Sequence, residues 1–144
     1  MPSESTEHST LVEGGAMYIR RTYSNIKLLS TDTFSPLGAG RLIPLLDHQP
    51  DIVTELTGGR IIIGEAKTDS DALRPHSQEQ YKSFITYLSQ LNPQGIFLLF
   101  CSWKVAPGAY DWLRNYMRKQ EGIEVSWEVV SDVDVTRRTH DTAH

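Results

Sequence analysis

The stretch PDIVTELTGGRIIIGEAK, residues 50–67, contains the pattern that decides the fold. Its first part, residues 51–56, alternates side chains in the way that is typical of a strand. The Gly58-Gly59 pair that follows is a strong hairpin signal, because both glycines accept the positive φ angles that a tight turn requires. Residues 60–67 then form the return strand. The stretch therefore predicts an antiparallel β-hairpin.

This hairpin would place two carboxylates side by side, since Asp51 begins the outgoing strand and Glu65 lies near the end of the return strand. Two carboxylates a few ångströms apart repel, and each raises the pKa of the other. A hard divalent cation removes that cost. Magnesium binds through one or two carboxylates, keeps several waters and takes substrate phosphates. The end of the hairpin therefore predicts a magnesium site held by Asp51 and Glu65.

A lysine follows the second carboxylate at strand spacing. Lys67 is two residues beyond Glu65, so both side chains point to the same face of a strand. The side chain of Ala66 points to the other face, while its backbone carbonyl stays within reach of the metal. A lysine beside a metal-bound water can orient that water or assist its deprotonation, and the metal stabilises charge on a phosphate. This arrangement favours phosphodiester hydrolysis.

Upstream of the hairpin, residues 10–27 place apolar side chains at helical intervals and predict a helix, although Gly14 and Gly15 lower its propensity. Residues 30–40 (STDTFSPLGAG) have the composition of a loop. A further strand is predicted at residues 41–46. The hairpin would thus belong to a group of two or three antiparallel strands.

Downstream of the hairpin, helices and strands alternate. The predicted elements are a helix at 77–91, a strand at 96–101, a helix at 107–120 and a strand at 123–130. In the first helix, Ser77 and Gln80 have the spacing of a capping box. The strand at 96–101 (IFLLFC) is apolar on both faces and is expected to be central, and with the following helix and strand it forms a βαβ unit. The whole pattern predicts an α/β domain with a mixed sheet.

The length of 144 residues suits one domain, predicted at 10–131 between a frayed N-terminus, 1–9, and a polar tail, 132–144. The single cysteine, Cys101, excludes a disulfide within the chain and a cysteine-based zinc site. The three tryptophans are expected to lie in the core.

The composition also bears on location and partners. The first residues are polar and lack the apolar segment of a signal peptide. The longest apolar run is far too short to span a membrane, so a cytoplasmic location and no membrane partner are expected. The net charge of −4 argues mildly against tight, non-specific DNA binding but is compatible with a local basic face.

The residues Pro50-Asp51 and Glu65-Ala66-Lys67 resemble the signature of the PD-(D/E)XK nuclease superfamily, and the predicted elements over about residues 10–130 follow a similar order. The resemblance implies a restriction-endonuclease-like fold, with a mixed β-sheet flanked by helices in the order α-β-β-β-α-β-α-β. It also implies that Asp51, Glu65 and the Ala66 carbonyl bind Mg²⁺, for which Mn²⁺ can substitute. Lys67 would be the catalytic lysine.

Two further positions of the resemblance lie on helices. RecB-like exonucleases carry a glutamine and a tyrosine after the lysine; here Gln80 matches, but Phe84 stands at the tyrosine position and lacks a hydroxyl. The first helix of the family supplies a metal-site histidine in RecB-like enzymes, which His8 would match, or a glutamate in Holliday-junction resolvases, which Glu13 would match. A helix beginning near Ser9 would leave His8 outside, which favours Glu13.

The resemblance implies a Mg²⁺-dependent nuclease that hydrolyses DNA with a metal-activated water. The alternatives are an inactive nuclease-fold module that binds DNA or a protein partner, and an RNA-directed nuclease. Arg60, Arg74 and Lys82 are the candidates for DNA contact. So small a domain leaves little room for target recognition, so a homodimer or a larger nucleic-acid-processing assembly is an open expectation. The plain structural alternative is that Glu65 and Lys67 form an ion pair at a solvated strand end.

Overall fold

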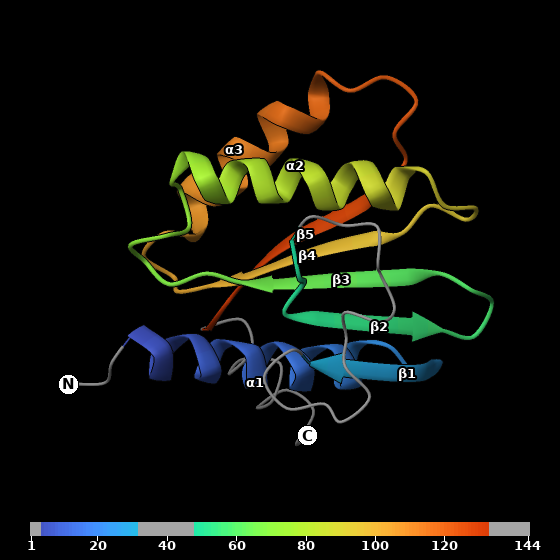
Figure 1. Cartoon of the computed structure of the whole chain (residues 1–144), viewed down its shortest axis with the longest axis horizontal. Helices are drawn as coiled ribbons and strands as arrows, with labels where there is room; N and C mark the ends of the chain where they lie inside the picture. Colours follow the sequence, from blue (N-terminus) through green and yellow to red (C-terminus); the bar gives the residue numbers. More distant parts are fainter. Residues whose placement is uncertain (1–3, 32–47, 133–144) are drawn as a thin grey trace.

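The computed structural model describes residues 4–31 and 48–132 and shows a five-stranded mixed sheet with helices on both faces (Figure 1). The order of elements is the predicted α-β-β-β-α-β-α-β. The elements are α1 (Glu4–Thr22), β1 (Ile26–Thr31), β2 (Ile52–Leu56), β3 (Ile61–Ala66), α2 (Pro75–Ser89), β4 (Ile96–Cys101), α3 (Ala106–Arg118) and β5 (Ser126–Ser131). The α/β class with a mixed sheet is therefore confirmed.

The strands lie in the order β1-β2-β3-β4-β5, so each strand pairs with its neighbours in sequence. β1, β2 and β3 pair antiparallel, whereas β3, β4 and β5 pair parallel. The parallel pairing of β4 with β5 across α3 confirms the predicted βαβ unit. The sheet thus joins an antiparallel half that contains the hairpin to a parallel half that contains the apolar centre.

The predicted hairpin is formed by β2 and β3. At its turn, Gly58 and Gly59 have φ angles of 99° and 90°, values that L side chains rarely adopt. The Leu56 N–H donates to the Arg60 carbonyl at 2.9 Å and closes the turn. The register pairs Ile52 with Gly64, so the next pair along the two strands is Asp51 and Glu65. The sequence prediction for these two carboxylates is confirmed by this register.

The core has two parts, one on each face of the sheet. α1 covers one face, where it packs against side chains such as Ile62 and Ala66 of β3. α2 and α3 cover the other face, where Ile63 of β3 is buried (Figure 1). Every residue of β4 is buried, as its uniformly apolar sequence predicts.

α1 lies unusually close to the sheet at one glycine. A Cβ added at Gly15 would lie 2.7 Å from the ring of Phe100 and 3.0 Å from Ile52, whereas a Cβ added at Gly14 would meet nothing within 4 Å. Gly15 therefore lets the helix backbone approach the sheet, while Gly14 has no such role. This close packing sets the position of α1 and therefore of His8, which lies on the same helix.

The two glycines give a matched test of this packing. Gly14→Ala is expected to stabilise the fold by about 0.5–1 kcal/mol, because alanine has the higher helix propensity and open space around it. Gly15→Ala is expected to be less stable than Gly14→Ala by about 1–3 kcal/mol, because its methyl group would overpack Phe100. Urea unfolding of both variants measures the difference. Equal stabilities would contradict the close approach.

The N-terminal part of the chain differs from the prediction. The helix begins at Glu4, so residues 4–9 are helical rather than frayed. It ends at Thr22, and residues 26–31, assigned above to the end of the helix and to a loop, form β1 because they pair with β2. The strand predicted at residues 41–46 and the tail beyond residue 132 lie outside the described residues.

The start of α2 also corrects the prediction. The helix begins at Pro75, its N-cap residue is Arg74, and no side chain caps it. A proline at the first helical position has no N–H that needs a partner, and its fixed φ suits the helix. Ser77 is therefore a buried residue inside the first turn rather than the cap, and Gln80 is not the second half of a capping box.

Two of the three tryptophans lie where they were expected. Trp112 and Trp127 pack against the core on the α2 and α3 side. Trp103, in the loop after β4, is 58% exposed, so its predicted core position is wrong. None of the helices in the described ranges is long and apolar enough to cross a membrane.

Candidate metal and active site

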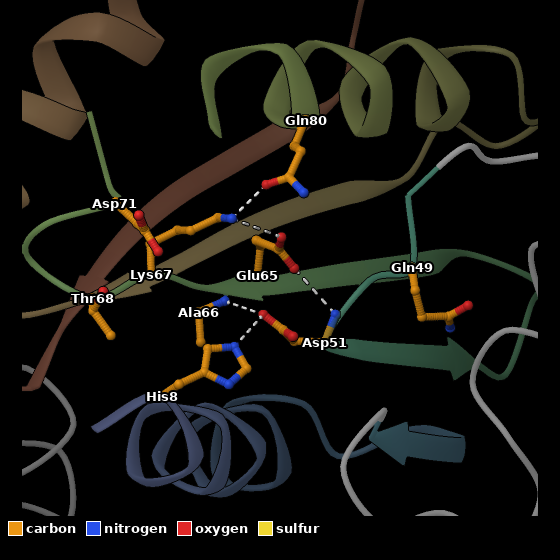
Figure 2. A pocket seen from close by; sticks show the side chains of 9 residues that line it. All are labelled: His8, Gln49, Asp51, Glu65, Ala66, Lys67, Thr68, Asp71 and Gln80. Carbon is orange, nitrogen blue, oxygen red and sulfur yellow. Dashed lines mark hydrogen bonds and ion pairs between the residues drawn. The ribbon is translucent and has the colours of Figure 1, made fainter. Parts of the chain in front are cut away.

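A pocket of about 370 Å³ lies at the end of the sheet where β2 begins and β3 ends (Figure 2). It receives side chains from both helix layers as well as from the hairpin. Its lining residues are His8, Gln49, Asp51, Glu65, Ala66, Lys67, Thr68, Asp71 and Gln80. The hairpin and α2 thus bring together the predicted residues Asp51, Glu65, Ala66, Lys67 and Gln80.

Asp51 is held by contacts from two elements, α1 and β3. Its Oδ2 accepts the Ala66 N–H at 2.9 Å and lies 3.1 Å from His8 Nε2 (Figure 2). Its backbone N–H donates to Glu65 Oε1 at 3.1 Å. The two acidic residues are both buried, with exposed fractions of 7% for Asp51 and 3% for Glu65. The hairpin end is therefore a buried, hydrogen-bonded pair of carboxyl groups.

The two carboxyl groups have opposite pKa shifts. Burial raises the pKa of Glu65 well above its ordinary 4.5, and the negative charge of Asp51 raises it further, while Lys67 opposes the shift. Burial also raises the pKa of Asp51, but hydrogen bonds from His8, Glu65 and the Ala66 N–H outweigh it and lower that pKa below 3.8. Burial and the neighbouring charge therefore favour the protonated form of Glu65, whereas the hydrogen bonds favour the charged form of Asp51.

Lys67 is fixed on the same side of β3 as Glu65. Its Nζ lies 3.6 Å from Glu65 Oε2 and donates a hydrogen bond to Gln80 Oε1 on α2. Its backbone N–H donates to the Phe100 carbonyl at 3.0 Å, which extends the pairing of β3 with β4. The Lys67 side chain is only 13% exposed. The ion pair between Glu65 and Lys67 is therefore present, but the prediction that it lies at a solvated strand end is wrong, because both partners are largely buried.

The first helix brings His8 to the site. His8 lies one turn before Val12 on the α1 face that packs against the sheet, and it lines the pocket. Glu13 follows Val12 by one position, is exposed, and does not line the pocket. The preference for Glu13 assumed that the helix began near Ser9. The helix begins at Glu4, which places His8 in a regular turn and corrects that preference.

The three predicted DNA-contacting residues lie in different places. Arg60 is at the far end of β3 from the pocket, where it donates to the Gln94 carbonyl at 3.1 Å and to Ser126 Oγ at 2.9 Å. Arg74 pairs with Asp71, a residue that lines the pocket, at 3.8 Å. Lys82 pairs with Glu79 on the exposed side of α2 at 3.2 Å. The structure therefore brings only Arg74 close to the pocket.

Three lining residues were not anticipated from the sequence. Gln49 precedes the hairpin, and Thr68 and Asp71 belong to the turn that follows Lys67, in which the Thr68 carbonyl accepts the Asp71 N–H at 3.0 Å. A turn has no periodic pattern that reveals its side-chain directions. The one available signal in the sequence was an acidic residue, Asp71, in the turn after Lys67.

The site residues fit a magnesium ion. Magnesium needs one or two carboxylates and keeps several waters, and a dication would relieve the repulsion within the buried Asp51–Glu65 pair. Within residues 4–31 and 48–132, no group of three or more His, Cys, Asp or Glu side chains is arranged to hold a metal ion. A ligand set of the two carboxylates, the Ala66 carbonyl and water would match the preference of this ion.

Comparison with known proteins leaves the function to be argued from the site itself. The sequence matches no family model, no curated protein and no solved structure.

Proposed function

We propose that the chain is a metal-dependent nuclease of the PD-(D/E)XK type that hydrolyses DNA phosphodiester bonds. The observation that carries the proposal is the buried set of Asp51, Glu65 and Lys67 at one end of a hairpin. Burying two carboxyl groups beside a lysine costs stability, and a cation with a phosphate ligand offsets that cost. The signature residues and the element order of the superfamily resemblance agree with this chemistry.

The proposed roles follow from the contacts. Asp51, Glu65 and the Ala66 carbonyl would hold Mg²⁺ or Mn²⁺, which when bound supplies an acidified water and stabilises charge on the phosphate. His8 and the Ala66 N–H fix the orientation of Asp51 through its Oδ2. Lys67, steadied by Gln80, orients the attacking water and contacts the negatively charged phosphate. Because a carboxylate ligand must be deprotonated, a cation held here would favour the charged form of Glu65.

An enzyme explains the site better than an inactive module does. A module that only binds a partner gains nothing from keeping Glu65 buried against Asp51, yet the pair and its lysine are all present. DNA is the proposed substrate. RNA is the alternative substrate, and a cleavage assay with both nucleic acids distinguishes the two. A homodimer or a larger assembly would supply the target recognition that this small domain lacks.

A substitution of Gln80 distinguishes the positioning of the attacking water from the binding of the metal. Gln80→Leu removes the acceptor of the Lys67 Nζ hydrogen bond but leaves both carboxylates in place. We expect the cleavage rate to fall by about 10- to 100-fold, while the affinity for Mn²⁺ stays unchanged. Gln90→Leu, at the other end of α2 and outside the pocket, is the matched control. A parallel loss of metal affinity would contradict this role for Gln80.

A cleavage panel tests the proposed function directly. Linear duplex, single-stranded, supercoiled and four-way-junction DNA and RNA are incubated with Mg²⁺, Mn²⁺ or a chelator. The wild type is expected to cut at least one DNA substrate only when metal is present, and Asp51→Asn is expected to lose that activity. Cutting in the chelator, or no cutting of any substrate, would count against a metal-dependent nuclease. Exclusive cutting of RNA would establish the alternative substrate.

A further inference from the structure

A second pocket, of about 320 Å³, lies beside the candidate active site and shares Thr68 with it. We propose that this second pocket binds an unpaired nucleobase of the strand that is cut. The inference rests on the proposed function and deepens it, because it assigns a substrate class with a single-stranded segment. Three features carry it: the make-up of the walls, the sign of their charge and the position of the pocket.

One wall of the second pocket is the first part of α1. Leu11 and Thr10 give it aliphatic surface, and Glu7 stands beside them. Leu11 is half-buried against the core on the α1 side, so this wall is fixed by the fold. A rigid wall that combines aliphatic and acceptor groups suits a flat heterocycle, as small-molecule pockets generally do.

The opposite wall is made by the turns after β3 and β4 and by Asp132, which directly follows β5, and hydrogen bonds hold these parts together. Ser102 Oγ donates to Asp69 Oδ1 at 2.5 Å, which ties the turn after β4 to the turn after Lys67. The Trp103 N–H donates to Asp132 Oδ1 at 3.0 Å, which ties the same turn to the end of β5. The wall is therefore already formed in the absence of a ligand.

The charge of this pocket selects a base rather than a phosphate. Its lining contains Glu7, Asp69 and Asp132 and, among the described residues, no lysine or arginine. Carboxylates repel a phosphate but accept hydrogen bonds from the exocyclic amino group of a base. Cytosine carries such an amino group where uracil and thymine carry a carbonyl oxygen. The pocket should therefore prefer cytosine to uracil.

The position of the pocket places that base next to the bond to be cut. Thr68 is adjacent to Lys67 and borders both pockets, so a strand whose phosphate faces Lys67 has a neighbouring base at the second pocket. A base paired in a duplex has its amino edge occupied, and extrusion from the duplex costs free energy. Single-stranded DNA, or a frayed end, is therefore the substrate class that this geometry favours.

Trp103 directly follows Ser102, which lines the second pocket. Its backbone is anchored to Asp132, and the residue is 58% exposed, unlike the half-buried Trp112 and Trp127. Stacking of a base on an exposed aromatic ring is sequence-tolerant, because every base has a π face. Trp103 is thus expected to add affinity for any unpaired strand, while the carboxylates give the preference for an amino-bearing base.

The test measures binding of short oligo(dC) and oligo(dU) to the Lys67→Ala chain, which keeps the oligonucleotides intact, by fluorescence anisotropy in Mg²⁺. We expect oligo(dC) to bind about fivefold more tightly. Asp69→Asn retains the oxygen that accepts the Ser102 hydrogen bond but replaces the other carboxylate oxygen by an NH₂ group. This variant should bring the ratio of the oligo(dC) and oligo(dU) affinities to about one. Glu121→Gln, an exposed carboxylate at the other end of the sheet, should leave the ratio unchanged.

Two ring substitutions complete the test. Trp103→Ala should weaken the binding of both oligonucleotides about tenfold and leave the ratio of their affinities unchanged. Trp103→Phe should restore most of the lost affinity. A dC-to-dU ratio near one, or a preference that Asp69→Asn does not reduce, would overturn the base subsite. If wild-type cleavage still required Mg²⁺ and Lys67, the proposed nuclease would survive that result. Base-selective binding without any cleavage would support the subsite and overturn the nuclease.

Discussion

Replacing Lys67 with alanine is expected to lower the rate of metal-dependent cleavage by about 10²- to 10⁴-fold, because the group that orients the attacking water is lost. The ammonium of Lys67 is held by Glu65 at 3.6 Å and by Gln80, and the described lining of the pocket contains no other lysine or arginine. The fold should survive, because alanine suits this position and the backbone hydrogen bond to Phe100 is unaffected. Single-turnover cleavage of the best substrate from the panel measures the effect.

Lys27 offers a matched control for this substitution. Its Nζ lies 3.6 Å from Glu55 Oε1, the same separation as in the Lys67–Glu65 pair, but its side chain is 65% exposed. Lys27→Ala should leave the cleavage rate within about twofold of the wild type, because an exposed ion pair contributes little. Equal rates for wild type and Lys67→Ala would remove Lys67 from the proposed mechanism.

Glu65→Gln is expected to abolish metal-dependent cleavage and at the same time to stabilise the metal-free protein. The amide resembles the protonated carboxyl group that the metal-free fold favours, so the variant avoids burying a charge beside Asp51. At neutral pH we expect a gain of about 1–3 kcal/mol in the free energy of unfolding. Added Mg²⁺ should raise the melting temperature of the wild type and leave that of the variant unchanged.

The pH dependence of this gain follows from the raised pKa of Glu65. The folded chain holds the Glu65 proton more tightly than the unfolded chain, so the stability from that proton is complete below the ordinary pKa of 4.5. It is lost as the pH rises through the raised pKa of the folded state. The advantage of Glu65→Gln should therefore grow with pH over this window.

Urea unfolding at several pH values measures the trend, and Glu55→Gln, on the partly exposed side of β2, provides the control. This comparison separates the effect of the buried position of Glu65 from the effect of replacing any carboxyl group of the hairpin. A constant difference between wild type and Glu65→Gln across the window would contradict the raised pKa of Glu65.

Much of the fold could be predicted because its signals are local. The Gly58-Gly59 turn fixes the hairpin register, and that register alone places Asp51 beside Glu65. The uniformly apolar residues 96–101 identify the central strand without knowledge of its neighbours. These two features together indicate the mixed sheet and the end of the hairpin at which the candidate site lies.

The remaining features depend on contacts between distant parts of the chain. Residues 26–31 form β1 because they pair with β2, and neither segment alone shows this. His8 reaches Asp51 because Gly15 lets α1 approach the sheet, which a propensity argument treats only as a helix-weakening glycine. The second pocket is assembled by the first part of α1 and by residues that follow three strands, so no single segment of the sequence indicates it.

Metal binding at the hairpin is the central claim, and calorimetric titration with Mn²⁺ and Mg²⁺ tests it most directly. The wild type is expected to bind the ions in a reaction that releases a proton, with an affinity that rises as the pH rises through the Glu65 pKa. Asp51→Ala and Glu65→Gln should each lose this binding, while Glu13→Gln should retain it. Absence of binding by the wild type, or binding that Asp51→Ala leaves unchanged, would contradict the metal site.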